Sequence, residues 1–269
     1  MRGGSQAHLI VGDDDRQYVV KFTDNPQGTR TLVNEVVASQ LLRALRLPVP
    51  QWRPILVTKA YLGQNPHTLQ FGSVAVPVQP GLHFGSEYCG KDRPVYDWLP
   101  SPVLRGAQMA NAFLGIYVAD QWMAHQDVRQ AVFYRTQRHQ WCVRFIDHGY
   151  AFGGASWHFK NSFRWGTYYD HRVYNDVCSF GDVDCWISRI QDLKNDVLAS
   201  SCDAVPAGWL EGGEEDALCK LMDQLIVRRR RLCEIVEPVM RHPLSPFPTI
   251  AQNGTRAILS DIRDLAGAI

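Results

Sequence analysis

Near the middle of the chain stand two short acidic motifs, HQDVRQ at residues 125–130 and FIDHG at residues 145–149. Their aspartates, Asp127 and Asp147, each adjoin an apolar run, and residues 137–139 form a polar turn between the runs. This pattern predicts that Asp127 lies in a loop after a helix and Asp147 at the end of a short hairpin. Two carboxylates that face one cleft are what phosphoryl transfer requires, one to orient the nucleophile and one to hold Mg²⁺.

Two charged residues upstream strengthen this interpretation. Lys21 lies near the end of the β-rich run 17–22, and Glu35 falls in the second turn of a helix predicted for residues 31–45 from its apolar spacing. In a kinase, such a strand lysine contacts the α- and β-phosphates of ATP and is held by a glutamate on the next helix. Taken alone, the two residues could equally be an edge-strand lysine and a surface glutamate. Their position ahead of both aspartates favours the catalytic interpretation.

Three nearby features carry weaker signals. The turn that contains Gly4 and Ser5 could cradle phosphate through free backbone N–H groups, although a glycine-rich N-terminus is as often a flexible leader. It is not a P-loop, because GxxxxGK[ST] is absent from the chain. Arg129 could neutralise a phosphate or pair with an acid in its own loop. His125 is expected to be a helix-end residue whose cation suits the C-terminal dipole.

The apolar patterns divide the chain into a small β-rich part and a larger helical part, so the predicted fold class is α+β. Predicted strands cover residues 7–11, 17–22, 54–58, 69–78, 131–134 and 141–146, and predicted helices cover 31–45, 106–124, 182–198, 214–239 and 256–265. The segment 79–105 is rich in Gly and Pro and is predicted to connect two lobes. The expected divisions are an N-lobe at 1–80, a connection at 81–105, a helical C-lobe at 106–242 and a tail at 243–269.

The composition describes a soluble globular protein, with 45% hydrophobic and 20% charged residues among 269. A net charge of +1 gives no general attraction to nucleic acid or to a membrane surface, and no apolar run is long enough to span a bilayer. The seven cysteines form no CxxC pair, which indicates reduced, mostly buried thiols. No apolar segment of the kind found in signal peptides follows the first residues. A cytoplasmic protein with no direct nucleic-acid or membrane partner is expected.

Other groups of residues allow further interpretations. His125, Asp127 and His148 could bind a catalytic transition metal, but no HxxxH or HExxH spacing supports such a site. The four arginines at 228–231 are expected to be solvated or paired with acids, with a polyanion-binding patch as the alternative. The aromatic residues between positions 157 and 169 are expected to pack in the core rather than to stack on bases.

Taken together, the motifs resemble those of the HipA-like kinase domain family. The resembling features are YVVKF at 18–22, LVNE at 32–35, LPVP at 47–50, DQW at 120–122, the Asp127 loop and DHG at 147–149, in family order. The resemblance implies a protein-kinase-like bilobal fold that binds ATP and Mg²⁺ between a small β-rich N-lobe and a larger helical C-lobe. It also implies that Lys21 contacts phosphates, Glu35 pairs with Lys21, Asp127 is the base and Asp147 binds Mg²⁺.

The chain departs from the kinase pattern at the second metal ligand. An asparagine usually stands five residues after the base, and here that position is Val132. Gln130 has a carbonyl oxygen and could replace the asparagine as a metal ligand if the loop is remodelled by one residue. A weaker second site would slow the reaction or favour Mn²⁺ over Mg²⁺. HipA proteins also place arginine directly after the aspartate, whereas here Val128 intervenes before Arg129.

The expected function is ATP- and Mg²⁺-dependent transfer of the γ-phosphoryl group to a Ser or Thr hydroxyl of a protein, including the chain itself. Arg129 and Gln130 would support the two aspartates in that reaction. Two alternatives stay open: a pseudokinase that binds nucleotide or a partner without turnover, and a kinase that acts on a small molecule. The phosphate acceptor is accordingly a protein or a small molecule.

Overall fold

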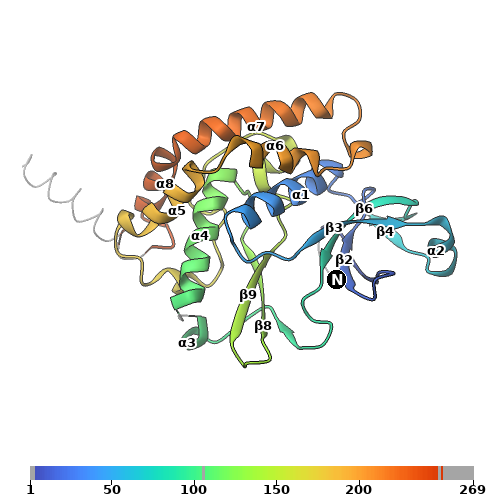
Figure 1. Ribbon diagram of the computed structural model, residues 1–269, viewed down its shortest axis with the longest axis horizontal. Coiled ribbons are helices and arrows are strands. Elements are labelled where there is room, and N and C mark those ends of the chain that lie inside the picture. Colours follow the sequence, from blue (N-terminus) through green and yellow to red (C-terminus); the bar gives the residue numbers. More distant parts are fainter. Residues whose placement is uncertain (1–3, 105–106, 248–249, 251–269) are drawn as a thin grey trace, which may run out of the picture.

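The computed structural model describes residues 4–104, 107–247 and 250, and it has a small part rich in strands and a larger part rich in helices (Figure 1). Its strands are β1 (His8–Val11), β2 (Gln17–Lys21), β3 (Trp52–Val57), β4 (Thr68–Phe71), β5 (Val74–Pro77), β6 (Gly81–Glu87), β7 (Val95–Tyr96), β8 (Gln130–Arg135) and β9 (Trp141–Ile146). Its α-helices are α1 (Thr29–Ala44), α2 (Lys59–Gln64), α3 (Ser101–Leu104), α4 (Ala107–Met123), α5 (Asp184–Gln191), α6 (Asn195–Asp203), α7 (Glu214–Arg230) and α8 (Leu232–Arg241). Short 3₁₀ helices are η1 (Ala151–Ser156), η2 (His171–Tyr174), η3 (Phe180–Val183) and η4 (Ala207–Trp209). The predicted α+β class is confirmed, and the helix predicted at 256–265 lies outside the described residues.

The sheet of the N-lobe consists of four antiparallel strands in the order β1-β2-β6-β3. Successive side chains of β2 point to opposite faces of this sheet. Tyr18 and Val20 are buried on one face, within a small core formed by Ile10, Tyr18, Val20, Phe22, Val57, Leu69 and Val78. Val19 and Lys21 lie on the other face and line a cavity. The alternation in β2 therefore decides which side chains can reach that cavity.

Helix α1 is buried along most of its length because it packs against α6, η1 and β6 at once. Leu32, Val36 and Leu41 are fully enclosed, as the apolar spacing predicts. The helix also buries two polar residues, Asn34 and Glu35, which costs free energy unless each finds partners. Asn34 finds its partners in a segment more than a hundred positions further along the chain, and Glu35 finds its partner on β2 of the N-lobe sheet, as described below.

The C-lobe is built around α4, whose Phe113, Tyr117 and Trp122 are fully buried. Helices α5, α7 and α8 pack against α4 (Figure 1). The antiparallel sheet β7-β8-β9 also contacts this helix, and the ring of Phe113 meets the edge of Phe145 on β9 at a centroid distance of 5.2 Å. This packing brings the chain that leaves α4 next to the end of β9, as the two acidic motifs require.

The segment predicted to connect the lobes begins with a strand. Strand β6 lies between β2 and β3 at the centre of the N-lobe sheet. Its two glycines and the surrounding Gly- and Pro-rich composition weakened its strand signal, and no alternation reveals it, because His83, Phe84 and Gly85 are buried in succession. Gly85 is required there, because a Cβ at this position would lie 2.3 Å from Cγ1 of Ile55 on β3. The predicted connection at 81–105 is therefore wrong over residues 81–87, while the remaining domain divisions stay predictions.

Three predicted elements are each divided in the structure. The strand predicted at 69–78 is the hairpin β4–β5, which turns at Gly72 with a φ of +62° that a two-residue hairpin loop favours. The helix predicted at 182–198 is replaced by η3, α5 and α6. The helix predicted at 214–239 is interrupted at Arg231, whose φ of −103° and ψ of 20° end α7 before α8 begins.

The thiols differ from the expectation of mostly buried cysteines. All seven are unpaired; Cys178, Cys185, Cys219 and Cys233 are exposed, and Cys89, Cys142 and Cys202 are half-buried. Within the described ranges, no helix combines the length and the apolar character that crossing a membrane requires.

Candidate active site

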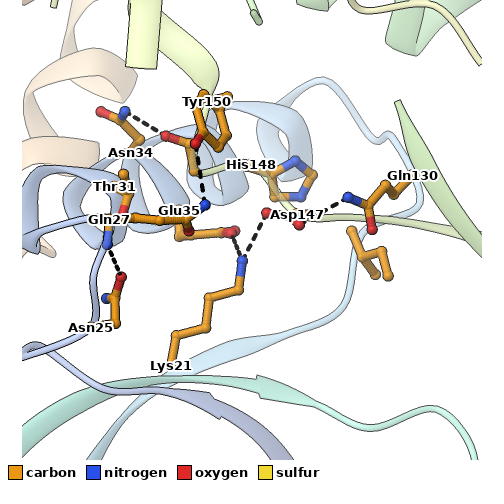
Figure 2. Close-up of polar contacts among 12 residues, drawn as sticks. Lys21, Asn25, Gln27, Thr31, Asn34, Glu35, Gln130, Asp147, His148 and Tyr150 are labelled. Carbon is orange, nitrogen blue, oxygen red and sulfur yellow. Dashed lines mark hydrogen bonds and ion pairs between the residues drawn. The ribbon is translucent and has the colours of Figure 1, made fainter. Parts of the chain in front are cut away.

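Lys21 is the centre of a charged cluster that joins the two lobes (Figure 2). Its ammonium forms an ion pair with the Glu35 carboxylate on α1 and lies 2.8 Å from Oδ1 of Asp147, which directly follows β9. The side chain of Lys21 is 11% exposed and that of Glu35 only 3%, whereas the side chain of Asp147 is 33% exposed. The structure therefore brings together three of the predicted site residues and leaves the aspartate accessible.

The charges in this cluster affect one another strongly. Burial alone would lower the pKa of Lys21, but the carboxylates of Glu35 and Asp147 outweigh burial and hold that pKa above its ordinary value. Burial would raise the pKa of Asp147, and its attraction to Lys21 lowers it instead. The pKa of Glu35 is raised, first by burial and then by the charge of Asp147, against the effect of Lys21. Lys21 is thus a permanent cation beside an ionised Asp147.

Asn34, the neighbour of Glu35 on α1, holds the segment 149–157 that follows Asp147. Its Nδ2 lies 2.8 Å from the carbonyl oxygen of Gly149, 3.0 Å from that of Ala151 and 3.2 Å from that of Gly154. Its Oδ1 accepts a hydrogen bond from the indole N–H of Trp157 at 2.8 Å. Every polar atom of this fully buried amide therefore has a partner, and α1 fixes both Lys21 and the backbone after Asp147.

His125 connects the loops that carry the two aspartates. Its Nε2 lies 3.2 Å from the carbonyl oxygen of Asp147 and donates to it in the tautomer that carries the proton there. Burial, followed by the nearby Arg129 guanidinium, lowers the pKa of His125, which keeps the ring neutral. Its Nδ1 lies 3.3 Å from the backbone nitrogen of Asp127 and 3.1 Å from the carbonyl oxygen of the same residue. His125 is 1% exposed and is a bridge between loops, not the charged helix-end residue that was expected.

Asp127 itself sits in the loop predicted for it. Its Oδ1 accepts the backbone N–H of Val128 at 2.7 Å, and its carbonyl oxygen accepts that of Gly166 at 2.9 Å. No hydrogen bond to Oδ2 arises from the part of the chain that the structure describes, so this oxygen is available to another partner. Arg228 on α7 stabilises the end of α4, from which the loop starts. Its guanidinium donates to the last-turn carbonyls of Gln121 and Trp122 at 2.8 and 2.9 Å.

Arg129 does not reach the cleft, which corrects the expectation that it neutralises a phosphate. The residue is fully buried, and its guanidinium forms a bidentate ion pair with Asp120 on α4 at 2.6 and 2.8 Å. Its Nη1 also donates to the carbonyl oxygen of Ile146 and to Nδ1 of His148, each at 3.0 Å. The acid that pairs with Arg129 lies on the preceding helix rather than in the same loop. Arg129 thus positions the end of β9 and makes no contact with the cleft.

Gln130 lies where a second metal ligand could act. It is the first residue of β8, and its Nε2 donates to Oδ2 of Asp147 at 3.0 Å. Val132, two positions further along the same strand, lines the cavity with an apolar side chain. The loop after Asp127 is therefore so short that the position five residues after the base already belongs to the strand. Gln130 contacts Asp147 through its amide nitrogen, whereas a metal would require its carbonyl oxygen, so its role as a metal ligand stays a prediction.

A cavity of about 220 Å³ lies between the lobes beside this cluster. Its walls include Val19, Lys21, Glu35, Phe84, residues 86–89, Val95, Gln130, Val132 and residues 146–148. Ser5 also lines the cavity, whereas Gly4 is exposed, and a Cβ on Gly4 would lie 2.5 Å from Nε2 of Gln27. Gln27 in turn donates to the Tyr150 hydroxyl at 3.2 Å (Figure 2). The N-terminal turn thus closes one side of the cavity, with Ser5 rather than Gly4 facing inward.

The other interpretations of the sequence find less support. In the ranges that the structure covers, no three His, Cys, Asp or Glu side chains are grouped as a metal site, and both ring nitrogens of His125 have hydrogen-bond partners. Of the arginine run, Arg229 bonds the Asn195 side chain and Arg231 pairs with Glu234. Trp157, Phe159, Phe163 and Tyr168 pack in or against the core, as expected, whereas Trp165 is half-buried outside that cluster and Tyr169 is exposed.

Sequence reasoning missed the residues that position this site. Asp120 and Asn34 were noted only as parts of motifs, and His125 was interpreted as a helix-end cation or a metal ligand. Each is a polar residue inside an apolar run, and a buried polar residue requires a partner. That signal predicts a hydrogen bond for each of these residues but not which distant segment supplies it.

Comparisons with known proteins agree with the architecture. A family model described as HipA-like kinase matches residues 1–233. Among solved structures, the crystal structure of a Helicobacter pylori proinflammatory kinase, CtkA, is similar, with a TM-score of 0.52 and 11% identity over 87% of this chain and 93% of that chain. At that identity the likeness concerns the fold alone, and it confirms the predicted kinase-like fold. A comparison with curated proteins gives no match.

Proposed function

Since the chain belongs to the HipA-like kinase family, we propose that it transfers the γ-phosphoryl group of ATP to a Ser or Thr hydroxyl of a protein. The observation that carries this proposal is the cluster of Lys21, Glu35 and Asp147 at the wall of the interlobe cavity. A buried lysine fixed by a helix glutamate beside an accessible aspartate is the arrangement with which kinases hold nucleotide phosphates and metal.

The nucleotide would occupy the cavity beside this cluster. Lys21 supplies a fixed positive charge for the phosphates, and the apolar side chains of Val19 and Phe84 line the space that an adenine ring would take. Residues 87–89 also border the cavity, and their backbone polar groups would be the partners of the base. A cavity of about 220 Å³ encloses part of a nucleotide, so the triphosphate would extend toward Asp147.

The oxygen donors at the cavity fit a divalent cation. Asp147 provides a carboxylate, and the Gln130 amide, whose Nε2 donates to that carboxylate, would turn its oxygen toward a cation; carboxylate and amide oxygens are the hard ligands that Mg²⁺ and Mn²⁺ prefer. One lysine among two carboxylates leaves this cluster with a net negative charge when all three groups are ionised, which attracts a cation. When bound, the metal would neutralise charge on the β- and γ-phosphates. The role of the chain is to hold Asp147 in place through Lys21, Gln130 and the backbone bond from His125.

We assign to Asp127 the role of base, which accepts the proton of the hydroxyl group that receives the phosphoryl group. Its Oδ2 is available for a hydrogen bond, and the residue does not belong to the lining of the nucleotide cavity. The carboxylate can accept the proton of an acceptor hydroxyl while its loop stays fixed by His125 and Gly166. Positioning and charge neutralisation account for most of the acceleration in such reactions, because the transition state is loose and highly charged.

A second candidate is a pseudokinase that binds nucleotide without turnover. The observation that favours it is Val132, which places an apolar side chain at the cavity where kinases have a metal-binding asparagine. Gln130 weighs against this candidate, because its amide already contacts Asp147.

The deciding experiment measures the intact mass of purified protein after incubation with ATP and either Mg²⁺ or Mn²⁺. Casein is added in parallel as an external protein acceptor, and the Asp127→Asn variant is the matched control. Phosphate-mass adducts on either protein with wild type, and none with the variant, would establish transfer and identify the base. Absence of adducts on both proteins, together with tight nucleotide binding by calorimetry, would replace the kinase proposal with the pseudokinase.

A further inference from the structure

A second cavity, of about 580 Å³, lies next to the connection between the lobes, and five of its fifteen lining residues are cations. We call it the basic groove. Its charged lining residues are Arg43, Arg46, Lys91, Arg93 and Arg144, with Glu87 and Asp92 as acids. Five positive and two negative side chains give this lining a formal charge of +3, whereas the whole chain carries only +1. The positive charge of the molecule is therefore concentrated at this groove.

The cations of the basic groove lack acidic partners. Within the described ranges, none of the five lies within 4.0 Å of a carboxylate. Glu87 is engaged elsewhere, because it lies 3.9 Å from Arg16. Like charges gathered in a concave space repel one another and focus the potential that attracts an anion.

Two of the guanidinium groups are held in place by a single ring. Arg93 lies 5.0 Å from the ring centroid of Tyr134, and Arg144 lies 5.5 Å from the same centroid. Tyr134 is 7% exposed, so its ring is held in place and offers both cations a contact before any ligand arrives. Two guanidinium forks beside one ring match the geometry of phosphate oxygens.

The groove draws its cations from three separate elements. Arg43 and Arg46 come from the end of α1, where the helix dipole favours positive charge. The dipole does not account for Lys91 and Arg93 in the connection or for Arg144 on β9. Because these segments are far apart in the sequence, their convergence is a property of the folded molecule and not of one basic stretch.

We propose that the basic groove binds a compact oligophosphate anion. The volume of the groove suits a small molecule, and a net charge of +3 calls for several negative charges within a few ångströms. An oligophosphate provides that charge density. In an extended acidic peptide, by contrast, successive residues are about 3.3 Å apart along the chain, so its carboxylates are more widely spaced. RNA binding generally uses exposed aromatic faces for stacking, and Tyr134 is buried between arginine side chains here.

The site is distinct from the nucleotide cavity, although the two are neighbours. Pro50, Glu87, Tyr88 and Cys89 line both spaces, but Lys21 and Asp147 belong only to the first and the five cations only to the second. A phosphate compound could therefore bind at either place, and the experiment has to separate them.

The test is calorimetric titration of the full chain with tripolyphosphate at constant ionic strength. Arg93→Gln/Arg144→Gln is expected to weaken binding by about tenfold or more, because two charge-assisted contacts are lost. Arg43→Gln is expected to weaken it as well, and this exposed residue makes no contact with Tyr134, so its loss leaves the packing unchanged. Arg138→Gln, an exposed arginine in the turn after β8 that does not line the groove, is the matched control and should bind as wild type does.

Several results would overturn the proposal. Equal affinity of wild type and the double variant would do so, as would equal weakening by Arg138→Gln. Loss of binding in Lys21→Met, with the groove variants unaffected, would assign the tripolyphosphate to the nucleotide cavity. Binding of a dodecameric RNA that depends on the groove arginines, without binding of tripolyphosphate, would make the groove a nucleic-acid site instead. The outcome is independent of phosphoryl transfer, because no step of the assay requires turnover.

Discussion

Lys21 and Asp147 are 126 positions apart in the chain, yet the Lys21 ammonium lies 2.8 Å from the Asp147 carboxylate. The pair joins the N-lobe sheet to the loop that follows β9, and Glu35 completes it from α1 (Figure 2). Lys21 already neutralises part of the negative charge of Asp147. A nucleotide that enters with its metal would therefore compete for both groups, its phosphates for Lys21 and its metal for Asp147. The two aspartates of the site should therefore respond differently to substitution.

Asp147→Asn is expected to weaken metal-dependent nucleotide binding more than Asp127→Asn does. Asp147 lines the cavity and loses a charge-assisted contact, whereas Asp127 lies outside the lining. A charge-assisted interaction of this kind corresponds to about 10–100-fold in affinity. Calorimetric titration with ADP in the presence and absence of Mg²⁺ measures the difference. Equal nucleotide affinity for both variants and wild type would remove the metal role from Asp147.

Much of this site follows from the sequence. The β-rich run 17–22 and the apolar spacing of α1 are strong local patterns, so the lysine and the glutamate could be placed on their elements. The hairpin that carries Asp147 was equally clear. The predicted strand, helix and hairpin are confirmed. Each follows from the spacing of apolar residues and from the turn residues within a short stretch of chain.

What the sequence did not reveal depends on long-range contacts. Strand β6 is held by its two neighbours, and its glycines weaken the local signal. Arg129 looked like a phosphate ligand because it follows a catalytic-loop aspartate, but Asp120 on α4 binds it in the interior. No local pattern contains the partner of a buried charge, so such roles become visible only in the folded chain.

Gln130→Ala is expected to raise the Mg²⁺ concentration needed for half-maximal nucleotide binding by about tenfold. The variant removes the amide that contacts Asp147 and with it the side-chain oxygen that we assign to the metal. Val132→Ala is the matched control, because it shortens an apolar side chain of the same strand that also lines the cavity. Titrations with Mg²⁺ and Mn²⁺ at fixed nucleotide give the midpoints. If Val132→Ala shifts the midpoint as much as Gln130→Ala, the amide has no metal role.

Arg129→Leu is expected to reduce the free energy of unfolding by about 3–5 kcal/mol, because it leaves the buried Asp120 carboxylate without a partner. The double variant Arg129→Leu/Asp120→Leu should lose less, since it removes both charges together. Urea denaturation of the three proteins measures the two differences. A stable Arg129→Leu protein that binds nucleotide but has lost turnover would restore the phosphate-contacting role that the geometry removes.

Asn34→Asp is expected to destabilise the protein by on the order of 3 kcal/mol. The substitution keeps an acceptor for the Trp157 indole but replaces the donor that contacts three carbonyl oxygens. Asn111→Asp is the matched control, because Asn111 also accepts an indole N–H, from Trp186 at 3.0 Å, and is exposed. Thermal melting compares their stabilities, and limited proteolysis should show new cleavage at 149–157 only for Asn34→Asp. Similar behaviour of both variants would mean that the amide does not hold this segment.

The stability of the protein is expected to fall as the pH decreases below about 6.5, and His148 is one cause. This residue is 2% exposed, and burial, followed by the charge of Arg129, holds its pKa well below the ordinary value of 6.5. The unfolded chain therefore takes up a proton in this range while the folded chain does not, which favours unfolding by up to about 1.4 kcal/mol per pH unit for each such histidine. The effect begins near pH 6.5 and continues downward until the folded histidine itself is protonated.

His148→Asn isolates this contribution. The asparagine oxygen can replace Nδ1 as the acceptor for Arg129, which lies 3.0 Å from it, but the side chain does not titrate. Urea denaturation of wild type and variant between pH 7 and pH 5 should give a shallower pH dependence for the variant. Asp147, with its lowered pKa, loses stabilisation only at more acidic pH, and Glu35 is present in both proteins, so neither creates the difference. Parallel curves would show that His148 carries its proton in the folded protein, and the neutral ring that accepts from Arg129 would have to be abandoned.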